Sequence, residues 1–170
     1  LEHAKSRGIL PYCEIVGWGM SSASTKTTDW PDNSRGVILA MTRALESANL
    51  TPDAIDTIQG AANGGKNPDK IETDAFLQLF GSTQTAPAIS SIKGALGESF
   101  SSGGTQAAAL ALSIREGKVP PTLGLSVPMA ELPFVTGRSR DIDIRTGLLN
   151  AVSYGGTNVS IVMGKIRDME

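Results

Sequence analysis

The sequence predicts an α/β layered fold, in which helices pack against a central sheet. Short runs rich in Val, Ile and other apolar residues alternate along the chain with longer segments whose apolar residues recur at helical spacing. Clusters of Gly, Pro, Asn, Asp and Ser separate the two kinds of segment. At 170 residues the chain is long enough to bury a core, so we predict a single domain over residues 1–170.

The predicted strands are short apolar runs that end at turn-forming residues. They cover residues 12–20, 55–59 and 87–91, and a closing pair lies on either side of Tyr154. Residues 21–33 are rich in Ser, Thr and Asp, and they therefore predict a surface loop after the first strand.

The predicted helices begin at capping residues and present an apolar stripe to the sheet. The first helix ends at Gly8, and the second follows the capping residues 32–34. A short helical turn starts at Thr51-Pro52, and a longer helix begins at Asn67-Pro68. The last helix covers residues 101–116. The stripes of the two middle helices consist of Val37, Ile38, Met41, Leu45, Ala48, Ile71, Ala75, Phe76 and Leu79. The last helix is so rich in alanine that we expect it to lie buried between layers.

Composition narrows the range of partners. The formal net charge of −2 gives no electrostatic footprint for nucleic acid or for an anionic membrane. The single cysteine, Cys13, excludes an internal disulfide and is typical of a protein of the reducing cytoplasm. The longest apolar run, residues 107–114, is far shorter than the ~20 residues that a membrane helix needs. The sequence indicates no cofactor and no metal site.

Residues 149–163 contain two apolar, strand-like runs that meet at Gly155-Gly156. This pair permits positive φ and close approach of another group to the backbone, and the simplest interpretation is a hairpin turn. The segment also resembles the Asn-Ser-Phe-Gly-Phe-Gly-Gly-Thr-Asn loop of the β-ketoacyl-acyl-carrier-protein synthases. In that family the loop lies beside the active-site cysteine, and the resemblance puts Tyr154 at the aromatic position that gates the acyl pocket.

Other segments resemble the same family in the same order. Asp69-Lys70-Ile71-Glu72, Ser90-Ser91-Ile92-Lys93 and Val119-Pro120-Pro121-Thr122 are similar to its Asp-x-x-Glu, Ser-Ser-Thr-Lys and Pro-Pro-Thr motifs, and residues 1–17 are similar to the opening of its C-terminal half. The resemblance implies a thiolase-like layered sandwich, C-terminal half, with a mixed sheet and packed helices. By this resemblance, we expect the N-terminal half that carries the nucleophilic cysteine to be absent from residues 1–170. Cys13 is no substitute for that nucleophile, because a lone cysteine on a strand is more often a small buried filler.

The resemblance also shows which catalytic groups are replaced. Active members use a cysteine and two histidines, whose imidazoles can donate a hydrogen bond to a developing enolate oxygen near neutral pH. Ala61 occupies the first histidine position and Glu98 the second, and the one remaining histidine, His3, lies in the opening helix. No catalytic residue is therefore intact. This loss resembles the chain-length factors, non-catalytic partners that dimerise with an active ketosynthase and shape the tunnel for the growing chain.

The function implied by the resemblance is a C-terminal domain of a β-ketoacyl-synthase-like protein in fatty-acid or polyketide-type biosynthesis, acting as a degenerate, chain-length-factor-like partner. The implied partners are acyl carrier protein and a ketosynthase subunit or N-terminal half, in a homo- or hetero-oligomer. The enzyme alternative is part of an active ketosynthase or acyltransferase whose cysteine lies in the missing N-terminal half. Asp69, Glu72 and Lys93 occupy positions of a charged network behind the family's active site, and we expect them to form a structural ion-pair network.

Three smaller expectations concern loops. Residues 60–66 fit the Gly-x4-Gly-Lys pattern of a phosphate-binding P-loop, but Asn67 replaces the hydroxyl residue that should hold magnesium, so nucleotide binding is a minor alternative. Gly103-Gly104 could bind a carrier-protein phosphate at a helix start, or could simply allow close helix packing. We expect Tyr154 to be ordered and hydrogen-bonded, as a fixed wall of an acyl pocket or interface.

Overall fold

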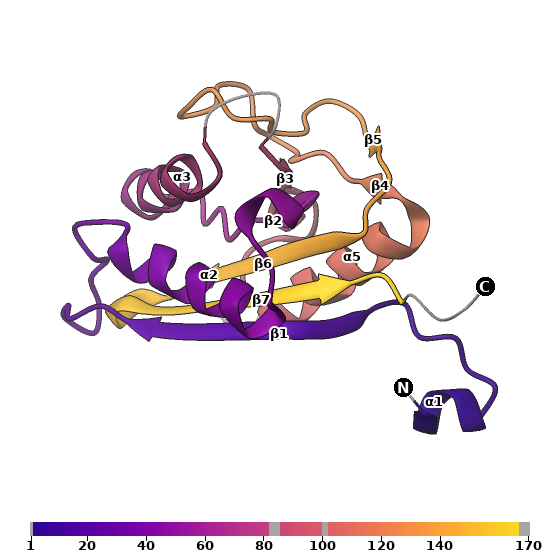
Figure 1. Cartoon of the computed structure of the whole chain (residues 1–170). Helices are drawn as coiled ribbons and strands as arrows, with labels where there is room; N and C mark the ends of the chain where they lie inside the picture. The colour runs from indigo at the N-terminus through magenta and orange to yellow at the C-terminus, as the bar shows by residue number, and fades with distance from the viewer. Residues whose placement is uncertain (1, 82–85, 100–101, 167–170) are drawn as a thin grey trace.

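The structure is a computed structural model that describes residues 2–81, 86–99 and 102–166. Five strands form one sheet in the order β1-β7-β6-β2-β3 (Figure 1). The pairs β1–β7 and β7–β6 are antiparallel, whereas β6–β2 and β2–β3 are parallel. This mixed sheet with packed helices confirms the fold class that the sequence predicts.

The strands of the main sheet are β1 (Glu14–Ser22), β2 (Thr57–Gln59), β3 (Ala88–Ser90), β6 (Thr146–Val152) and β7 (Thr157–Gly164), and a second sheet pairs β4 (Lys118–Val119) with β5 (Arg140–Asp141). The helices are α1 (Glu2–Ser6), α2 (Arg35–Ala48), α3 (Lys66–Phe80), α4 (Lys93–Leu96) and α5 (Ser102–Glu116), with short 3₁₀ turns η1 (Pro52–Ala54) and η2 (Tyr154–Gly156). Within the described residues, none of these helices has the length and apolar character needed to cross a membrane.

Helix α2 lies directly against β1 because two glycines of the strand face it. A Cβ atom built on Gly17 would stand 2.4 Å from the carbonyl oxygen of Ala44, and one on Gly19 would stand 2.2 Å from the carbonyl oxygen of Ala40. Both distances are far shorter than a van der Waals contact. The alternation Gly-Trp-Gly therefore sets one face of β1 for close helix packing and leaves the larger side chain for the other face.

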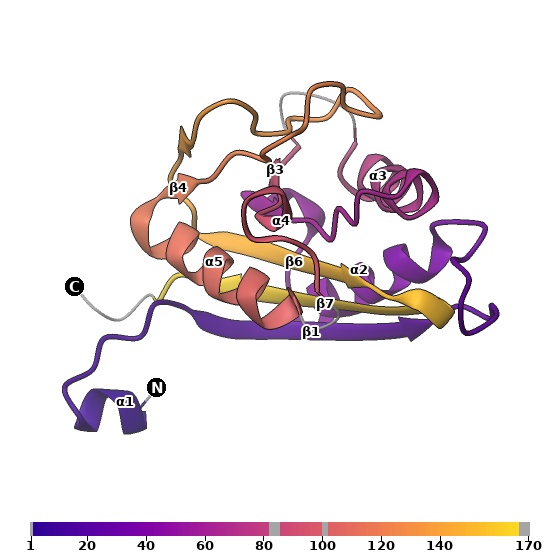
Figure 2. The ribbon, with the colours of Figure 1, turned by 180° about the vertical axis from the view of Figure 1, so that it is seen from behind.

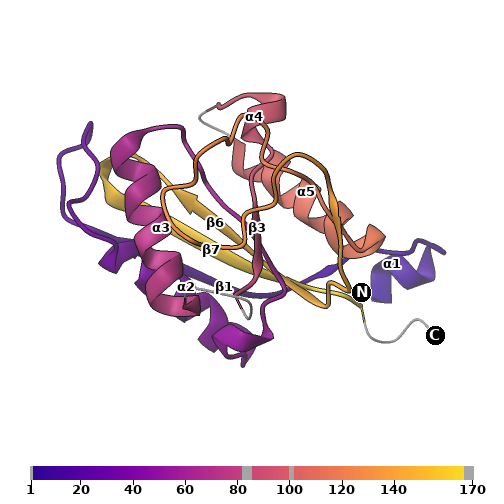
Figure 3. The same ribbon diagram turned by 90° about the horizontal axis from the view of Figure 1, so that it is seen from above.

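The two faces of the sheet carry separate apolar clusters. Along β6, Leu148 points to one face and Leu149 to the other. The α2 and α3 side is filled by Val37, Met41, Leu45, Ile58, Phe76, Leu148 and Val162. The α5 side is filled by Leu110, Ile114, Val119, Ile144, Leu149 and Met163. Seen from above, α3 and α5 accordingly lie on opposite sides of β6 and β7 (Figure 3).

No described residue of the chain covers the outer face of α5. The helix lies against β6 and β7 through one face (Figure 2). On its other face, Ala108 and Leu112 are exposed. The expectation that α5 lies buried between layers is therefore wrong for the described residues, because none of them packs on its far side. Exposed apolar side chains of β1 point to the same side of the sheet. We call this surface the open face, and its large apolar residues are Ile15, Trp18, Met20 and Leu112.

Candidate functional site

The parallel strands bring three loops to one edge of the sheet. Because β2, β3 and β6 run in the same direction, the loops that follow them, residues 60–65, 91–93 and 153–156, meet at their carboxyl ends. In open α/β sheets, ligands bind in the crevice outside these ends. A cavity of about 600 Å³ lies there, and residues of all three loops line it together with the first turns of α5.

This cavity collects the site residues that the sequence singles out from separate parts of the chain. Ala61, Glu98 and Tyr154 all line it, and the Ala61 side chain is buried. Asp69 and Glu72 instead line a second cavity of about 410 Å³. Asn63, Lys93 and Glu98 line both cavities, so these three residues form the wall between the two spaces.

Glu72 of α3 anchors the loop after β2. Its Oε1 accepts hydrogen bonds from the backbone N–H of Ala61 at 2.7 Å and from the Asn150 side chain at 2.6 Å, and its Oε2 accepts one from Ala62 N–H at 2.8 Å. Burial raises the pKa of Glu72 above its ordinary value, and the hydrogen bonds from Ala62, Asn150 and Ala61 oppose that rise. The carboxylate thus fixes the backbone on which the Ala61 methyl group is mounted.

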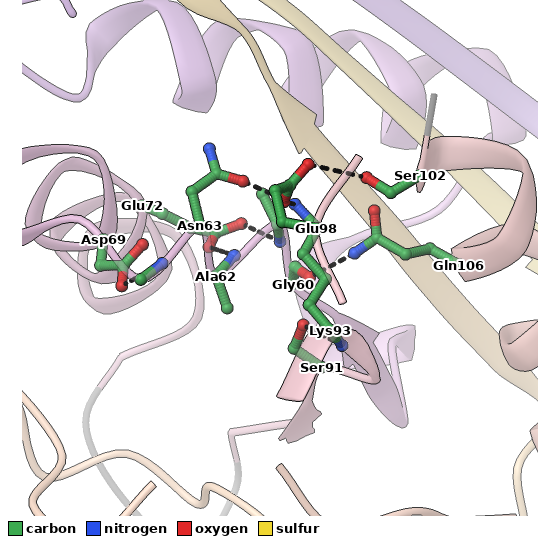
Figure 4. Close-up of polar contacts among 12 residues, drawn as sticks. Gly60, Ala62, Asn63, Asp69, Glu72, Ser91, Lys93, Glu98, Ser102 and Gln106 are labelled. Atoms are coloured by element: carbon green, nitrogen blue, oxygen red, sulfur yellow. Dashed lines mark hydrogen bonds and ion pairs between the residues drawn. The ribbon is translucent and has the colours of Figure 1, made fainter. Parts of the chain in front are cut away.

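Lys93 pairs with a different carboxylate from the one we expect. Its ammonium group forms an ion pair with Glu98 and donates a hydrogen bond to Asn63 Oδ1 (Figure 4). Within the described residues the direct ion-pair partner of Lys93 is therefore Glu98 and not Asp69 or Glu72, and Lys93 interacts with Asp69 only through its charge, which lowers the pKa of Asp69. The reason is positional: Lys93 and Glu98 lie at the two ends of one short connection around α4.

Asp69 belongs to the loop anchor on α3. Its Oδ2 accepts a hydrogen bond from the backbone N–H of Gly64 at 3.1 Å. Burial raises the pKa of Asp69, and the neighbouring backbone N–H groups and the charge of Lys93 act in the opposite direction. Asp69 and Glu72 therefore act together on residues 60–65, one on each end of the loop.

The loop that carries Tyr154 is fixed by its backbone. Gly155 and Gly156 have φ of 76° and 80°, and Gly155 N–H donates to the Asp29 carbonyl at 3.1 Å. Ala23 N–H donates to the Gly156 carbonyl at 2.8 Å, and a Cβ on Gly156 would come within 2.2 Å of the Ala23 carbonyl oxygen. Positive φ and close backbone approach, both expected from the Gly-Gly pair, are confirmed.

The side chain of Tyr154 departs from expectation in one respect. Its ring lies against the Trp30 ring, with centroids 4.5 Å apart, and the residue is 50% exposed. Within the described residues its hydroxyl has no hydrogen-bond partner, so the expected hydrogen bond is wrong. The hydroxyl of a half-exposed tyrosine can be solvated by water, which removes the need for a protein acceptor.

The loop at residues 60–66 has no free cradle for a phosphate. A P-loop binds phosphate through backbone N–H groups. Here the N–H groups of Ala61 and Ala62 donate to Glu72, and that of Gly64 donates to Asp69. Two carboxylates of the chain itself occupy the place of the anion, which argues against the nucleotide-binding alternative.

The side-chain amides of Asn150 and Gln106 are buried at the site, and their role was not predicted from the sequence. Asn150 interrupts the apolar strand β6 and links Glu72 to Ser160, whose Oγ donates to Asn150 Oδ1 at 3.0 Å. Gln106 lies in the alanine-rich α5 and donates to the Gly60 carbonyl at 2.7 Å. The available signal was the polar residue inside each otherwise apolar run, since a buried amide must find partners.

The Beta-ketoacyl synthase, C-terminal domain family matches residues 12–126 of the chain. The chain belongs to the β-ketoacyl synthase family. It is 35% identical over 173 residues to a mitochondrial 3-oxoacyl-[acyl-carrier-protein] synthase of Arabidopsis thaliana, an alignment that covers 97% of this chain and 37% of the relative. It is 31% identical to 3-oxoacyl-[acyl-carrier-protein] synthase 2 of Coxiella burnetii, with 99% and 41% covered.

Solved β-ketoacyl synthase structures share the fold. The ishigamide ketosynthase/chain length factor superposes with a TM-score of 0.90 at 28% identity, and a β-ketoacyl synthase from Burkholderia phymatum superposes with a TM-score of 0.84 at 28% identity. Each alignment covers 98% of this chain and 41% of the other. The resemblance and the thiolase-like fold predicted from the motifs are confirmed. The chain spans about two-fifths of the length of these relatives.

Proposed function

We propose that this chain is the C-terminal half of a β-ketoacyl-synthase-like protein that does not condense acyl groups and instead acts as a chain-length-factor-like partner in fatty-acid or polyketide-type assembly. The observation that carries the proposal is the make-up of the cavity beside Tyr154. Its described lining contains no imidazole and no thiol, and the two positions that hold histidine in active members hold Ala61 and Glu98.

Neither Ala61 nor Glu98 can replace an imidazole as a hydrogen-bond donor to an enolate oxygen. The methyl group of Ala61 has no hydrogen to donate to an enolate oxygen. Glu98 is ion-paired with Lys93, and a carboxylate in an ion pair accepts hydrogen bonds and repels a developing negative charge. What the cavity retains is shape: the Tyr154 ring and the apolar side chains of β6 and β7, Val152 and Val159, form a wall suited to an acyl chain.

The first test is a condensation assay. The protein, prepared as encoded with any residues that precede this chain, is incubated with carrier-bound acyl and malonyl thioesters. We expect no ketoacyl product above that of a boiled control, because transition-state stabilisation by both histidines is missing. Product at a rate comparable to that of an active ketosynthase would favour the enzyme alternative, in which a cysteine of a preceding half acylates and condenses.

The sequence encoded upstream separates the same two alternatives. A preceding half with a cysteine at its nucleophile turn favours the active enzyme or acyltransferase, whereas another residue there favours the non-condensing partner. Acyl carrier protein and a ketosynthase subunit or N-terminal half are the partners that we propose in either case. One relative of the fold, the ishigamide ketosynthase/chain length factor, is itself named for such a pairing.

The open face supports a layer contact with such a half. Trp18 is 61% exposed, and with Ile15 and Met20 it presents a row of large apolar side chains along β1. Apolar patches of this kind on a soluble chain mark interaction surfaces. A domain that covers the open face would bury α5 between two layers, as the alanine-rich sequence of that helix suggests.

Produced without a covering half, the chain is expected to self-associate at micromolar concentration through the open face. The double variant Trp18→Ser/Met20→Ser removes two of the four large apolar side chains of the open face and is expected to shift sedimentation toward the monomer. Leu39→Ser is the matched control, because Leu39 is 43% exposed on α2, on the opposite side of the sheet. A wild-type chain that sediments as a compact monomer, with no binding of a hydrophobic dye, would contradict the prediction.

A further inference from the structure

The cavity beside Tyr154 contains one cation and one anion, and they are paired with each other. Among the described residues that line it, Lys93 and Glu98 are the charged ones. The Lys93 side chain is only 9% exposed, whereas the Glu98 side chain is 45% exposed. The cation thus lies deep in the wall, and the carboxylate covers it from the solvent side.

Two of the three donors of the Lys93 ammonium group are already committed. Its ammonium group donates to Asn63 Oδ1 and contacts the Glu98 carboxylate. Glu98 is held in this position by Ser102 at the start of α5, whose hydroxyl donates to Oε1 at 3.2 Å. An incoming carboxylate would have to displace Glu98 or share Lys93 with it through the one remaining donor, and in both cases it would face the negative charge of Glu98 at short range.

We propose that the Lys93–Glu98 pair makes this cavity accept acyl groups that end in uncharged carbons and reject acyl groups that end in a carboxylate. The inference rests on the proposed function, in which an acyl chain occupies the cavity, and adds the class of acyl group. Glu98 is the residue that determines this specificity. Without its charge, the buried ammonium group of Lys93 would itself be a carboxylate site.

Two probes with three-carbon acyl groups separate the classes. Propionyl-pantetheine ends in a methyl group and malonyl-pantetheine ends in a carboxylate. In NMR or calorimetric titrations of the protein as encoded, we expect propionyl-pantetheine to bind at least about tenfold more tightly than malonyl-pantetheine. The reason is that the malonyl carboxylate disturbs the charge-assisted contact between Lys93 and Glu98 and is repelled by the negative charge of Glu98. The methyl ester of malonyl-pantetheine, which has no charge, should bind like the propionyl probe.

Glu98→Gln keeps the shape of the side chain and removes its charge. We expect it to strengthen malonyl binding about tenfold while propionyl binding changes less than threefold. Adding Lys93→Met to this variant should abolish the gain. Glu116→Gln is the matched control, since Glu116 also pairs with a basic residue, Arg115, on an exposed part of α5 and does not line the cavity.

The outcomes separate the inference from the function on which it rests. If propionyl-pantetheine binds but Glu98→Gln leaves malonyl binding unchanged, the charge selectivity is overturned and the acyl cavity survives. If neither probe nor the methyl ester binds, both the acyl cavity and its selectivity are overturned. The comparison of malonyl-pantetheine with its methyl ester needs no variant and decides the matter even where a substitution impairs folding.

Discussion

Glu72→Ala is expected to lower the free energy of unfolding by at least about 3 kcal/mol. The substitution leaves three donors, the N–H groups of Ala61 and Ala62 and the amide of Asn150, without their acceptor in the interior. A buried donor that loses its partner costs about 1–3 kcal/mol. Urea denaturation followed by circular dichroism measures the loss.

Two variants test whether the acceptor atoms of Glu72, rather than its volume, account for this effect. Glu72→Gln keeps a carbonyl oxygen that can serve Ala61 and Asn150, and it should recover more than half of the loss. Asp74→Asn changes a carboxylate on the same helix, but Asp74 pairs with Lys70 near the surface, and the expected change is below about 0.5 kcal/mol. A Glu72→Ala variant as stable as Asp74→Asn would show that residues 60–62 do not depend on this anchor.

Gly19→Ala is expected to lower the free energy of unfolding by about 2–3 kcal/mol, or to prevent folding. The added Cβ would stand 2.2 Å from the Ala40 carbonyl oxygen and 2.5 Å from Ala44 N, both of them backbone atoms that cannot rotate away. Helix α2 would have to move off the sheet, and overpacking of this kind typically costs 1–3 kcal/mol. The midpoint of thermal or urea unfolding reports the change.

Gly104→Ala is the matched control for Gly19→Ala. A Cβ on Gly104 meets no atom within 4 Å, and the residue is exposed in the first turns of α5. Because alanine favours helix, this variant should be neutral or more stable by up to about 1 kcal/mol. Equal effects of the two substitutions would mean that the close contact between β1 and α2 is not the reason for glycine at position 19.

The type and order of the helices and strands could be predicted from the sequence, whereas their exact ends and the pairing of the strands could not. Apolar stripes and short runs predicted α2, α3 and the five strands of the main sheet because local periodicity reports which face is buried, but they did not predict the short pair β4–β5. The first strand nevertheless continues to Ser22, inside the predicted loop, because Ser22 pairs with Thr157 of a strand near the other end of the chain. Such long-range pairing overrides local turn preference.

For the candidate site, too, the residues could be predicted from the sequence but their contacts could not. The motifs identified Ala61, Glu98 and Tyr154, and the parallel topology brings all three to one cavity. The partner of Lys93 was beyond reach, because choosing Glu98 over Asp69 depends on the path of the connection around α4. The exposure of α5 could not be predicted for another reason. The faces of an alanine-rich helix differ little in hydrophobicity, so its composition does not show whether one face or both faces are covered.

Backbone hydrogen bonds connect the Tyr154 loop, which lines the cavity, to residues 23–30, a segment that contains none of the family motifs described above. Gly155 and Gly156 are bonded to Asp29 and Ala23, and the Tyr154 ring rests on Trp30. A substitution in residues 23–30 would therefore move the wall while every motif residue stays unchanged. Two chains with identical motifs can therefore differ in the shape of this cavity, and a mutational survey confined to the motifs would miss the cause.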